Sequence, residues 1–462
     1  MKSIFPLIIF TAAIPVLRGA DVPRTDPASP TNPLVLTSEY ITLLADALRT
    51  NHPAVLAAEA RAEAAAQNAR AVRTWADPTV RLGALAAREP MRAEDGDLIY
   101  GVEQKLPLFG KPAAAREVAK AETEMANANT QYQFQLRRVD FTKHLLQAAL
   151  TDHLARIAQE DLQWLETLIA TLEQRLQAGQ ASQLELLKAQ NEKTRQADRL
   201  TTQINHRYHE RLAMNIMLGH WDGQPWPEFQ LPGVAPIIPH SPELDRLALK
   251  FEPKLRLMRQ EITRDDANAR LTRRQRLPDV SAGIEARNYT GDGSFRQGTL
   301  LLGITLPWVN RSSYKAEIAR DEARARATRL DVAEYELSVR EEIHKLLVMI
   351  DAARREAVLL RDQVIPRSQS GMEAIRAAWE AGRGTLADLF EARRMLLDAK
   401  SMYFRAVAEQ YTAMAQLVLC CGLGDLQAIE PFALPNRNNP AEATSGNPTN
   451  AGTTNSGKEP KP

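Results

Sequence analysis

Two pairs of short segments alternate between apolar and polar positions, which is the period of a β-strand whose two faces differ. The pattern predicts strands over about 79–87 and 98–106, and again over about 280–288 and 299–306. In the third of these, the even positions from Val280 to Ala286 are apolar, and the odd ones are small, polar or charged. Each strand is about nine residues long, enough to cross a bilayer at a tilt. Such alternation is typical of membrane-barrel strands.

Most of the remaining chain has apolar positions at helical spacing and few helix breakers. We expect helices from Ser38 to about Trp75, from Pro112 to Ala178, and from about Ser182 to Leu218. At 1.5 Å per residue the second would be ~100 Å long, and the two shorter ones, at ~57 Å each, would match it end to end. One long helix is therefore predicted to pack beside two stacked short ones.

The second half of the chain repeats the first. Gly83 recurs 200 positions later as Gly283, and Ala178-Gly179 recurs 203 positions later as Ala381-Gly382. A constant offset over so long a stretch indicates a duplicated unit. The second copy is expected to hold a helix to about Gln275, two strands, a long helix from Ser313, a turn at Gly382 to Gly384, and a closing helix to Cys421.

The two copies are flanked and joined by segments of different composition. Lys2 and the apolar stretch 4–17 indicate a secretory signal, with an uncleaved anchor as the alternative. The last residues have almost no apolar content and are expected to be disordered. The predicted organisation is a signal at 1–20, an extended lead-in at 21–37, a first repeat at 38–220, a Pro-rich linker at 221–243, a second repeat at 244–424 and a disordered tail at 432–462.

Composition and motifs exclude several classes of function. The 58 Lys and Arg nearly balance the 57 Asp and Glu of the 462 residues, so no strong field attracts nucleic acid. No phosphate-binding loop, nucleophile elbow or CxxC pair is present. His206 and His209 share a helix face without a third ligand, and the adjacent Cys420 and Cys421 cannot form an unstrained bridge. We expect no enzymatic activity, no cofactor and no metal site.

The predicted strands need partners from other copies of the chain. Two soluble hairpins with one wet face are an alternative, but these hairpins lie at the far end of very long helices, where no core covers an apolar face. Four strands cannot close a barrel, because the smallest known membrane barrels have eight. Three copies would supply twelve strands, an even number that closes around a lumen.

Together these features resemble the TolC family of outer-membrane efflux and secretion channels over about residues 38–424. The resemblance implies a mainly α-helical trimer, in which a twelve-stranded outer-membrane barrel stands on a long periplasmic α-helical barrel. Its helix tips meet a periplasmic adaptor and an inner-membrane pump. The supporting segments are the strand ends GVEQKLPLFGK at 101–111 and GITLPW at 303–308, the tips at Ala178-Gly179 and Ala381-Gly382, and the tandem repeat itself.

The resemblance also implies residues for a periplasmic gate. The family has acidic rings just after the tip of the second hairpin, where Asp388 and Glu391 stand here. They are three positions apart and share a helix face, so threefold symmetry would form rings that select cations. A merely solvated helix face is the alternative. The family also tends to have a tyrosine before the tip and a basic residue within it. In this chain Trp379 and Arg383 stand near those positions, and the basic residue is shifted by one.

Two further sets of residues concern contact and motion. Pro366 interrupts the second long helix, whereas the matching position in the first repeat is Gln163. A proline there removes a backbone hydrogen bond and should kink the helix, so we hypothesise that the second hairpin is the one that moves. The tips expected to contact the adaptor are Ala178, Gly179, Ala381, Gly382 and Gly384.

The predicted function is a passive exit duct of a tripartite efflux system. It would lie in the outer membrane, contact lipid, extend into the periplasm and serve an inner-membrane pump of the resistance-nodulation-division type. The Leu-Pro-Leu-Phe-Gly-Lys segment at 106–111 resembles the heavy-metal branch. The alternatives are a type I protein secretion duct and, from another class, a soluble periplasmic coiled-coil adaptor or structural protein. The sequence does not specify the cargo.

Overall fold

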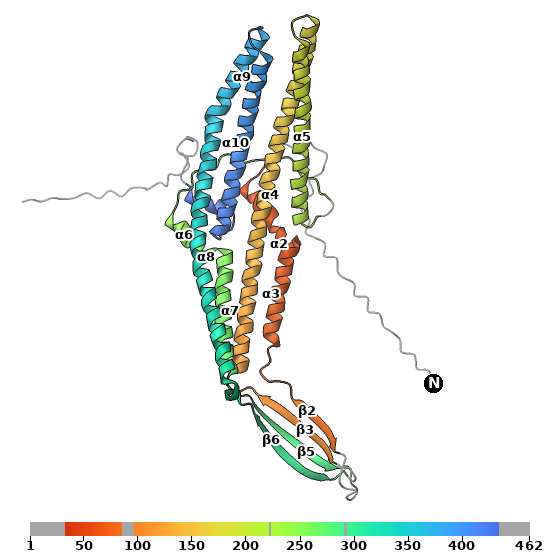
Figure 1. Cartoon of the computed structure of the whole chain (residues 1–462), viewed down its shortest axis with the longest axis vertical. Helices are drawn as coiled ribbons and strands as arrows, with labels where there is room; N and C mark the ends of the chain where they lie inside the picture. Colours follow the sequence, from red (N-terminus) through yellow and green to blue (C-terminus); the bar gives the residue numbers. More distant parts are fainter. Residues whose placement is uncertain (1–32, 86–96, 221–222, 291–292, 434–462) are drawn as a thin grey trace, which may run out of the picture.

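The helices form a long bundle, and a small β-sheet lies beyond one end of it (Figure 1). The computed structural model describes residues 33–85, 97–220, 223–290 and 293–433. The predicted signal at 1–20, most of the lead-in at 21–37 and nearly all of the tail at 432–462 lie outside the described residues. The described chain is mainly helical with a small β part, which confirms the predicted class.

The first helical segment is broken into three helices, so the prediction of one helix from Ser38 to about Trp75 is wrong. The helices are α1 (Ser38–Asp46), α2 (Leu48–Asn51) and α3 (Pro53–Ala71). Pro53 restricts the residue before it to extended backbone, and His52 has a ψ of 119°. The imidazole Nδ1 of His52 then accepts the N–H of Ala54 at 3.1 Å and caps α3.

The longest helix forms the axis of the first half. α4 (Lys111–Gln177) has 67 residues without interruption. It lies beside α3 along one part of its length and beside α5 (Gln183–Met217) along the other (Figure 1). The hairpin of α4 and α5 leads to a tip at the end of the molecule remote from the sheet.

The second half repeats the order of the long helices and strands, and one of its long helices has an interruption that its counterpart in the first half lacks. The first of its long helices passes through a π-helical turn before it continues to the tip. The elements are α6 (Pro242–Phe251), α7 (Pro253–Gln275), the 3-10 turn η1 (Pro307–Asn310), α8 (Arg311–Leu359), the π turn η2 (Leu360–Val364), α9 (Ile365–Glu380), α10 (Leu386–Cys420) and the 3-10 turn η3 (Gln427–Phe432).

A glycine after each closing helix allows close packing against the break in the first helices. A Cβ on Gly422 would clash with the carbonyl oxygen of Phe251, and one on Gly219 would lie 3.3 Å from that of Asn51. Both glycines also have positive φ, of 61° and 77°. These equivalent contacts give a physical reason for two features that recur in the sequence, the Xaa-Pro break and the closing glycine.

Four antiparallel strands form the sheet, in the order β2-β3-β5-β6. They are β2 (Thr79–Leu85), β3 (Asp97–Leu106), β5 (Val280–Tyr289) and β6 (Phe295–Ile304). The two hairpins meet through β3 and β5, and Val102 lies opposite Ile284. The sheet therefore joins both halves of the chain, while β2 and β6 are its edges. Among the described residues, no helix combines the length and the apolar character that a membrane span requires.

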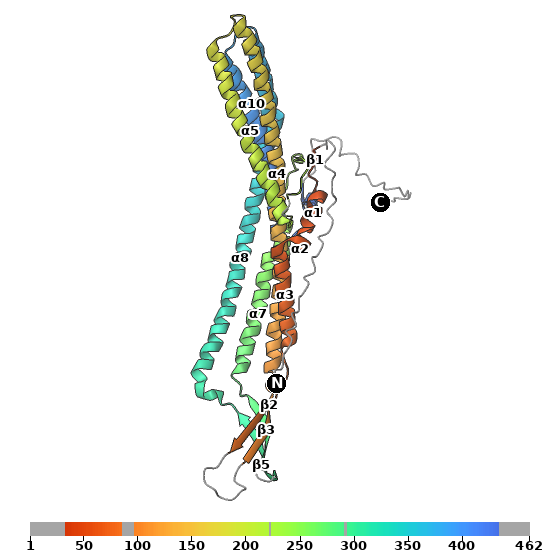
Figure 2. The same cartoon turned by 90° about the vertical axis from the view of Figure 1, so that its right-hand side faces the viewer.

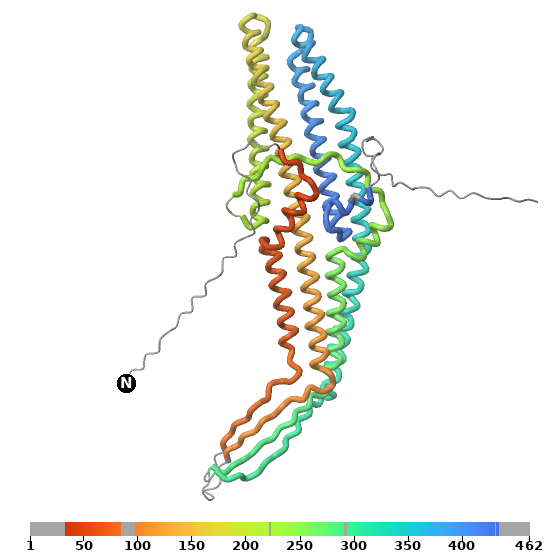
Figure 3. The backbone as a smooth tube through the Cα atoms, turned by 180° about the vertical axis from the view of Figure 1, so that it is seen from behind, coloured from red at the N-terminus to blue at the C-terminus, as the bar shows by residue number. Residues whose placement is uncertain are grey.

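The sequence pattern did not predict a second, very small sheet. β1 (Leu34–Val35), from the predicted lead-in, pairs in parallel with β4 (Phe229–Gln230), from the predicted linker. Figure 3 shows the linker crossing the middle of the helices, and Figure 2 places β1 and α1 at the same height. The main hydrophobic core lies in this middle zone and includes Phe141, Leu145, Phe229, Leu244, Ile343 and Leu417.

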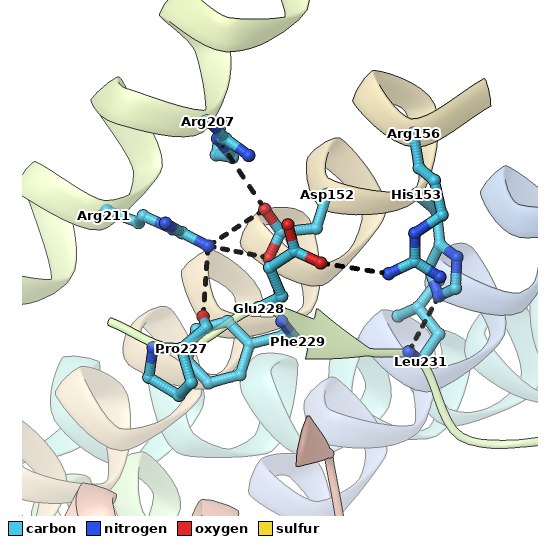
Figure 4. A network of polar contacts seen from close by, with 9 residues as sticks. All are labelled: Asp152, His153, Arg156, Arg207, Arg211, Pro227, Glu228, Phe229 and Leu231. Atoms are coloured by element: carbon cyan, nitrogen blue, oxygen red, sulfur yellow. Dashed lines mark hydrogen bonds and ion pairs between the residues drawn. The ribbon is translucent and has the colours of Figure 1, made fainter. Parts of the chain in front are cut away.

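A polar network ties the linker to the first half (Figure 4). The buried carboxylate of Asp152 accepts a hydrogen bond from the N–H of Phe229 at 2.9 Å. Arg211 Nη2 donates to both carboxylate oxygens of Asp152, each at 3.0 Å. Nε2 of the adjacent His153 accepts the N–H of Leu231 at 3.2 Å. Burial raises the pKa of Asp152, and the Phe229 N–H and Arg211 act in the opposite direction.

The same linker is held by the second half. The side-chain carbonyl of the fully buried Gln410 accepts the N–H of Ala235 at 3.1 Å, and its amide nitrogen donates to the carbonyl of Ala235 at 3.0 Å. The hydroxyl of Tyr411 donates to the carbonyl of Gly233 at 3.0 Å. The linker is thus bound by side chains from both repeats and fixes them to one another at mid-height.

Candidate functional site

The two helical hairpins end side by side in loops of the same conformation (Figure 1). Gly179 and Gly382 both have a φ of 72°, and the next N–H in each loop returns to a carbonyl five residues earlier. These bonds run from Gln180 to Arg175 and from Arg383 to Ala378, each at 2.8 Å. This is the Schellman motif, in which glycine avoids the strain that a side chain would meet.

The other predicted tip residues belong to the same loops. Ala178 and Ala381 are the C-caps of α4 and α9. The N–H of Gly384 donates to the carbonyl of Ala378 at 3.1 Å, and a Cβ on Gly384 would lie 3.1 Å from the Trp379 nitrogen. All five predicted tip residues therefore shape two narrow, exposed turns at one end of the molecule.

Asp388 has a structural role in addition to its charge. Its carboxylate accepts the hydroxyl of Thr385 at 2.7 Å and the N–H of Thr385 at 3.3 Å, while its own N–H donates to Thr385 Oγ1 at 3.2 Å. This capping box begins α10, and Ser182 and Glu185 begin α5 in the same way. Glu391 lies one turn further along, and both acidic side chains are exposed.

The structure places Trp379 and Arg383 in different environments. Trp379 is 7% exposed and packs in a small core cluster below the tips, whereas Arg383 is exposed. The guanidinium of Arg175 lies 4.2 Å from the centre of the Trp379 ring and donates to its carbonyl at 3.4 Å. Trp379 therefore connects the second hairpin to α4 of the first.

A second connection between the hairpins was not predicted from the sequence. Arg393 Nε on α10 donates to Asp161 Oδ1 on α4 at 2.8 Å, and the guanidinium lies 5.0 Å from the centre of the Trp164 ring. Both partners are largely buried. Burial raises the pKa of Asp161, and the hydrogen bond and charge of Arg393 act in the opposite direction. The repeat counterparts are Gln190 and Val364, so duplication gives no signal for this pair.

Pro366 is the second residue of α9, which follows the π turn directly. The N–H of Ile365 donates to the carbonyl of Leu360, five residues earlier, and Pro366 has no N–H to continue an α-helical pattern. The equivalent stretch of α4, around Gln163, is continuous helix. The interruption of one hairpin only, which the sequence pattern suggested, is therefore located at 360–366.

The β-sheet has one apolar and one polar face. Val80, Leu82, Val102, Ile284, Leu300 and Leu302 are all exposed on the apolar face. The exposed fractions of Leu82 and Leu300 reach 81% and 80%. Twist leaves a shallow hollow of about 690 Å³ across this face. So much contiguous apolar surface on a sheet indicates a site that is covered by lipid or protein.

Potential metal ligands do not cluster among the described side chains. In this part of the chain, no three His, Cys, Asp or Glu side chains lie together in a way that could hold a metal ion. Burial raises the pKa of both Cys420 and Cys421 to about 12, which leaves the thiols protonated and poorly reactive. The distinctive features are instead the hairpin tips, the π turn and the two-faced sheet.

Comparison with known proteins gives a consistent result. The cobalt-zinc-cadmium resistance protein CzcC of Cupriavidus metallidurans is 25% identical over 180 residues, and this match spans 37% of the present chain and only 41% of CzcC. The outer-membrane channel OprN is 19% identical with a TM-score of 0.72, over 83% of this chain and 90% of that one. CusC is 15% identical with a TM-score of 0.73, over 87% and 97%.

At these identities the likeness to OprN and CusC shows a shared fold. A family model described as outer membrane efflux protein matches residues 44–220 and 244–423, which together make up most of the chain. The match falls in two parts, one in each half, and leaves out the linker between them. The chain belongs to the outer membrane efflux protein family.

Proposed function

We propose that three copies of the chain form an outer-membrane channel, in which their sheets close into one twelve-stranded barrel. The observation that carries this proposal is the four-stranded sheet itself, with an exposed apolar face and unpaired edges at β2 and β6. Unpaired edges in lipid leave backbone groups without hydrogen bonds, and only a closed barrel satisfies all of them. The sheet therefore favours a membrane channel over a soluble adaptor.

In this arrangement the helices form a periplasmic extension that provides a passive route out of the cell. Both tips point away from the membrane, so that Gly179 and Gly382 meet a periplasmic adaptor. Asp388 and Glu391 would form two acidic rings at the entrance, because threefold symmetry repeats each carboxylate around the axis. Asp388 would combine this role with its capping of α10.

We further propose that the inner-membrane partner is a pump of the resistance-nodulation-division type and that the cargo is a heavy-metal cation. The support is the similarity to CzcC, a protein named for cobalt-zinc-cadmium resistance. The relatives found do not favour type I protein secretion. Deletion of the gene should lower the tolerated concentration of divalent heavy-metal ions, and complementation should restore it. Unchanged metal tolerance with altered drug tolerance would refute the metal assignment alone.

Two adjacent residues of β6 provide the test of the barrel. Leu300→Arg places a cation on the apolar face, at a cost of roughly 2–4 kcal/mol if that face meets the bilayer midplane. Thr299→Arg places the same cation on the polar face, and it is the matched control. We expect Leu300→Arg to reduce the heat-resistant trimer recovered from outer membranes, with little effect of Thr299→Arg. A water-soluble, single-copy wild type would overturn the proposal.

A further inference from the structure

The two central strands of the sheet carry matching tripeptides, Gly-Val-Glu in the first repeat and Gly-Ile-Glu in the second. Gly101-Val102-Glu103 in β3 pairs in antiparallel register with Gly283-Ile284-Glu285 in β5. Val102 lies opposite Ile284, so Gly101 faces Glu285 and Gly283 faces Glu103. The two motifs are therefore related by a local twofold axis through the central pair. Side chains alternate along a strand, so both glycines and both glutamates lie on the face opposite the exposed Val102 and Ile284.

The glycines of this motif are required by the close approach of the strands. A Cβ on Gly101 would lie 2.8 Å from the carbonyl oxygen of Ile284, and a Cβ on Gly283 would lie 2.9 Å from that of Val102. Either would also lie 3.3 Å from the Cβ of the glutamate opposite. Within the paired motifs, Glu103 and Glu285 are thus the only side chains that this face can accommodate.

Each glutamate is paired with an arginine. Arg81 on β2 forms an ion pair with Glu103, whose other carboxylate oxygen accepts the hydroxyl of Ser281 at 2.7 Å. Arg287 Nη2 lies 3.2 Å from Glu285 Oε1. Both glutamates are more buried than their arginines, whose side chains are 55% and 35% exposed. Lys105 adds an exposed cation to the same face.

Building on the proposed channel, we propose that this face lines the membrane part of the conduit and that the two arginine–glutamate pairs determine its ion selectivity. Three chains with two pairs each would place six carboxylates and six guanidiniums around the lumen. Opposite charges held in contact largely cancel at the distance of a permeating ion. The two pairs therefore give the barrel little preference of their own for cations or anions, and among the residues named on this face Lys105 adds the charge that they do not balance.

The test is the reversal potential of the purified full-length protein in planar lipid bilayers under a potassium chloride gradient. Two double variants are compared with wild type: Glu103→Gln with Glu285→Gln, and Arg81→Gln with Arg287→Gln. Both double variants break the same two ion pairs, so a purely structural effect shifts their chloride-to-potassium permeability ratios in the same direction. A charge effect moves them in opposite directions. We expect chloride permeability relative to potassium to rise roughly twofold or more in the glutamate variant and to fall similarly in the arginine variant.

The possible failures are distinguishable. A wild type that forms no ion-conducting trimer refutes the channel itself. Conducting variants that keep the wild-type permeability ratio, or that shift it in the same direction, refute the inference and leave the channel intact. If the double variants do not assemble, Lys105→Gln removes a charge from this face without breaking any ion pair found among the described residues. It should shift the ratio toward potassium, and an unchanged ratio overturns the inference.

Discussion

At the scale of single residues, the buried ion pair between the hairpins is a point where one substitution has a large effect. Arg393→Gln leaves the carboxylate of Asp161, which is 6% exposed, without its cation. We expect a loss of roughly 3 kcal/mol in stability, because an unpaired buried charge is costly. Adding Asp161→Asn should recover much of it, as measured by thermal unfolding followed by circular dichroism. Equal losses in the single and double variants would show that the charge is not the cause.

His153 provides a pH-dependent contribution to stability. Burial lowers its pKa from 6.5 to about 4, with Arg156 acting in the same direction and Glu228 in the opposite one. The unfolded chain therefore binds a proton before the folded one as the pH falls. Stability from this group is complete above pH 6.5 and is lost between there and about pH 4, by about 3 kcal/mol in total.

The comparison with His153→Gln isolates this contribution. A glutamine carbonyl can still accept the N–H of Leu231 but does not titrate. Asp152 and Asp161 have raised pKa values and change stability in the opposite sense over acidic pH, so only the difference between the two proteins is informative. Unfolding midpoints measured from pH 7 to pH 4 should fall more steeply for wild type. Parallel curves would contradict the prediction.

At the scale of elements, the turn at the second tip depends on glycine. Gly382→Ala forces a side chain into positive φ, at a cost of about 1 kcal/mol. Gly371 lies within α9, and a Cβ there would meet nothing within 4 Å. Gly371→Ala should therefore stabilise the helix by about 0.5–1 kcal/mol. Thermal unfolding of the two variants should shift in opposite directions, and a common direction would contradict this account.

The π turn is the element that we connect to opening of the entrance. Pro366→Ala restores an N–H donor and allows α8 and α9 to join in regular α-helical hydrogen bonding. We expect the second hairpin to straighten and the open probability in single-channel recordings to change severalfold relative to wild type. Gln163→Ala, at the equivalent position of the uninterrupted α4, is the control. Unchanged opening in Pro366→Ala would end the hypothesis that this hairpin moves.

At the scale of the whole molecule, local patterns were sufficient for most elements. Period-two alternation located β5 from Val280, and the glycine turns located both hairpin tips. The break at His52-Pro53 also follows from a local rule, since a proline disfavours helical backbone at the residue before it, but the prediction of one continuous helix did not apply that rule. These features depend on neighbours in sequence, so sequence reasoning can reach them.

The remaining features depend on tertiary contacts, for which the sequence gives no signal. β1 and β4 are two residues each and carry no periodicity. Arg175 and Arg393 are two of many arginines on long helices, and nothing distinguishes the ones that meet Trp379 and Asp161 across the hairpins. Trp379 was predicted as a gate residue from its place near a tip. The structure places it in a buried cluster, and the sequence carries no signal for that contact.

The small parallel sheet at mid-height has a consequence for the order in which the molecule can mature. Leu34 can pair only after Phe229 has been synthesised, and the linker can be held from its other side only after Gln410 has been synthesised. Closing so distant a loop is slow and entropically costly. The linker and the small sheet of β1 and β4, which join the repeats, are therefore expected to fold last. Until then, the two helical hairpins are not fixed to one another at mid-height.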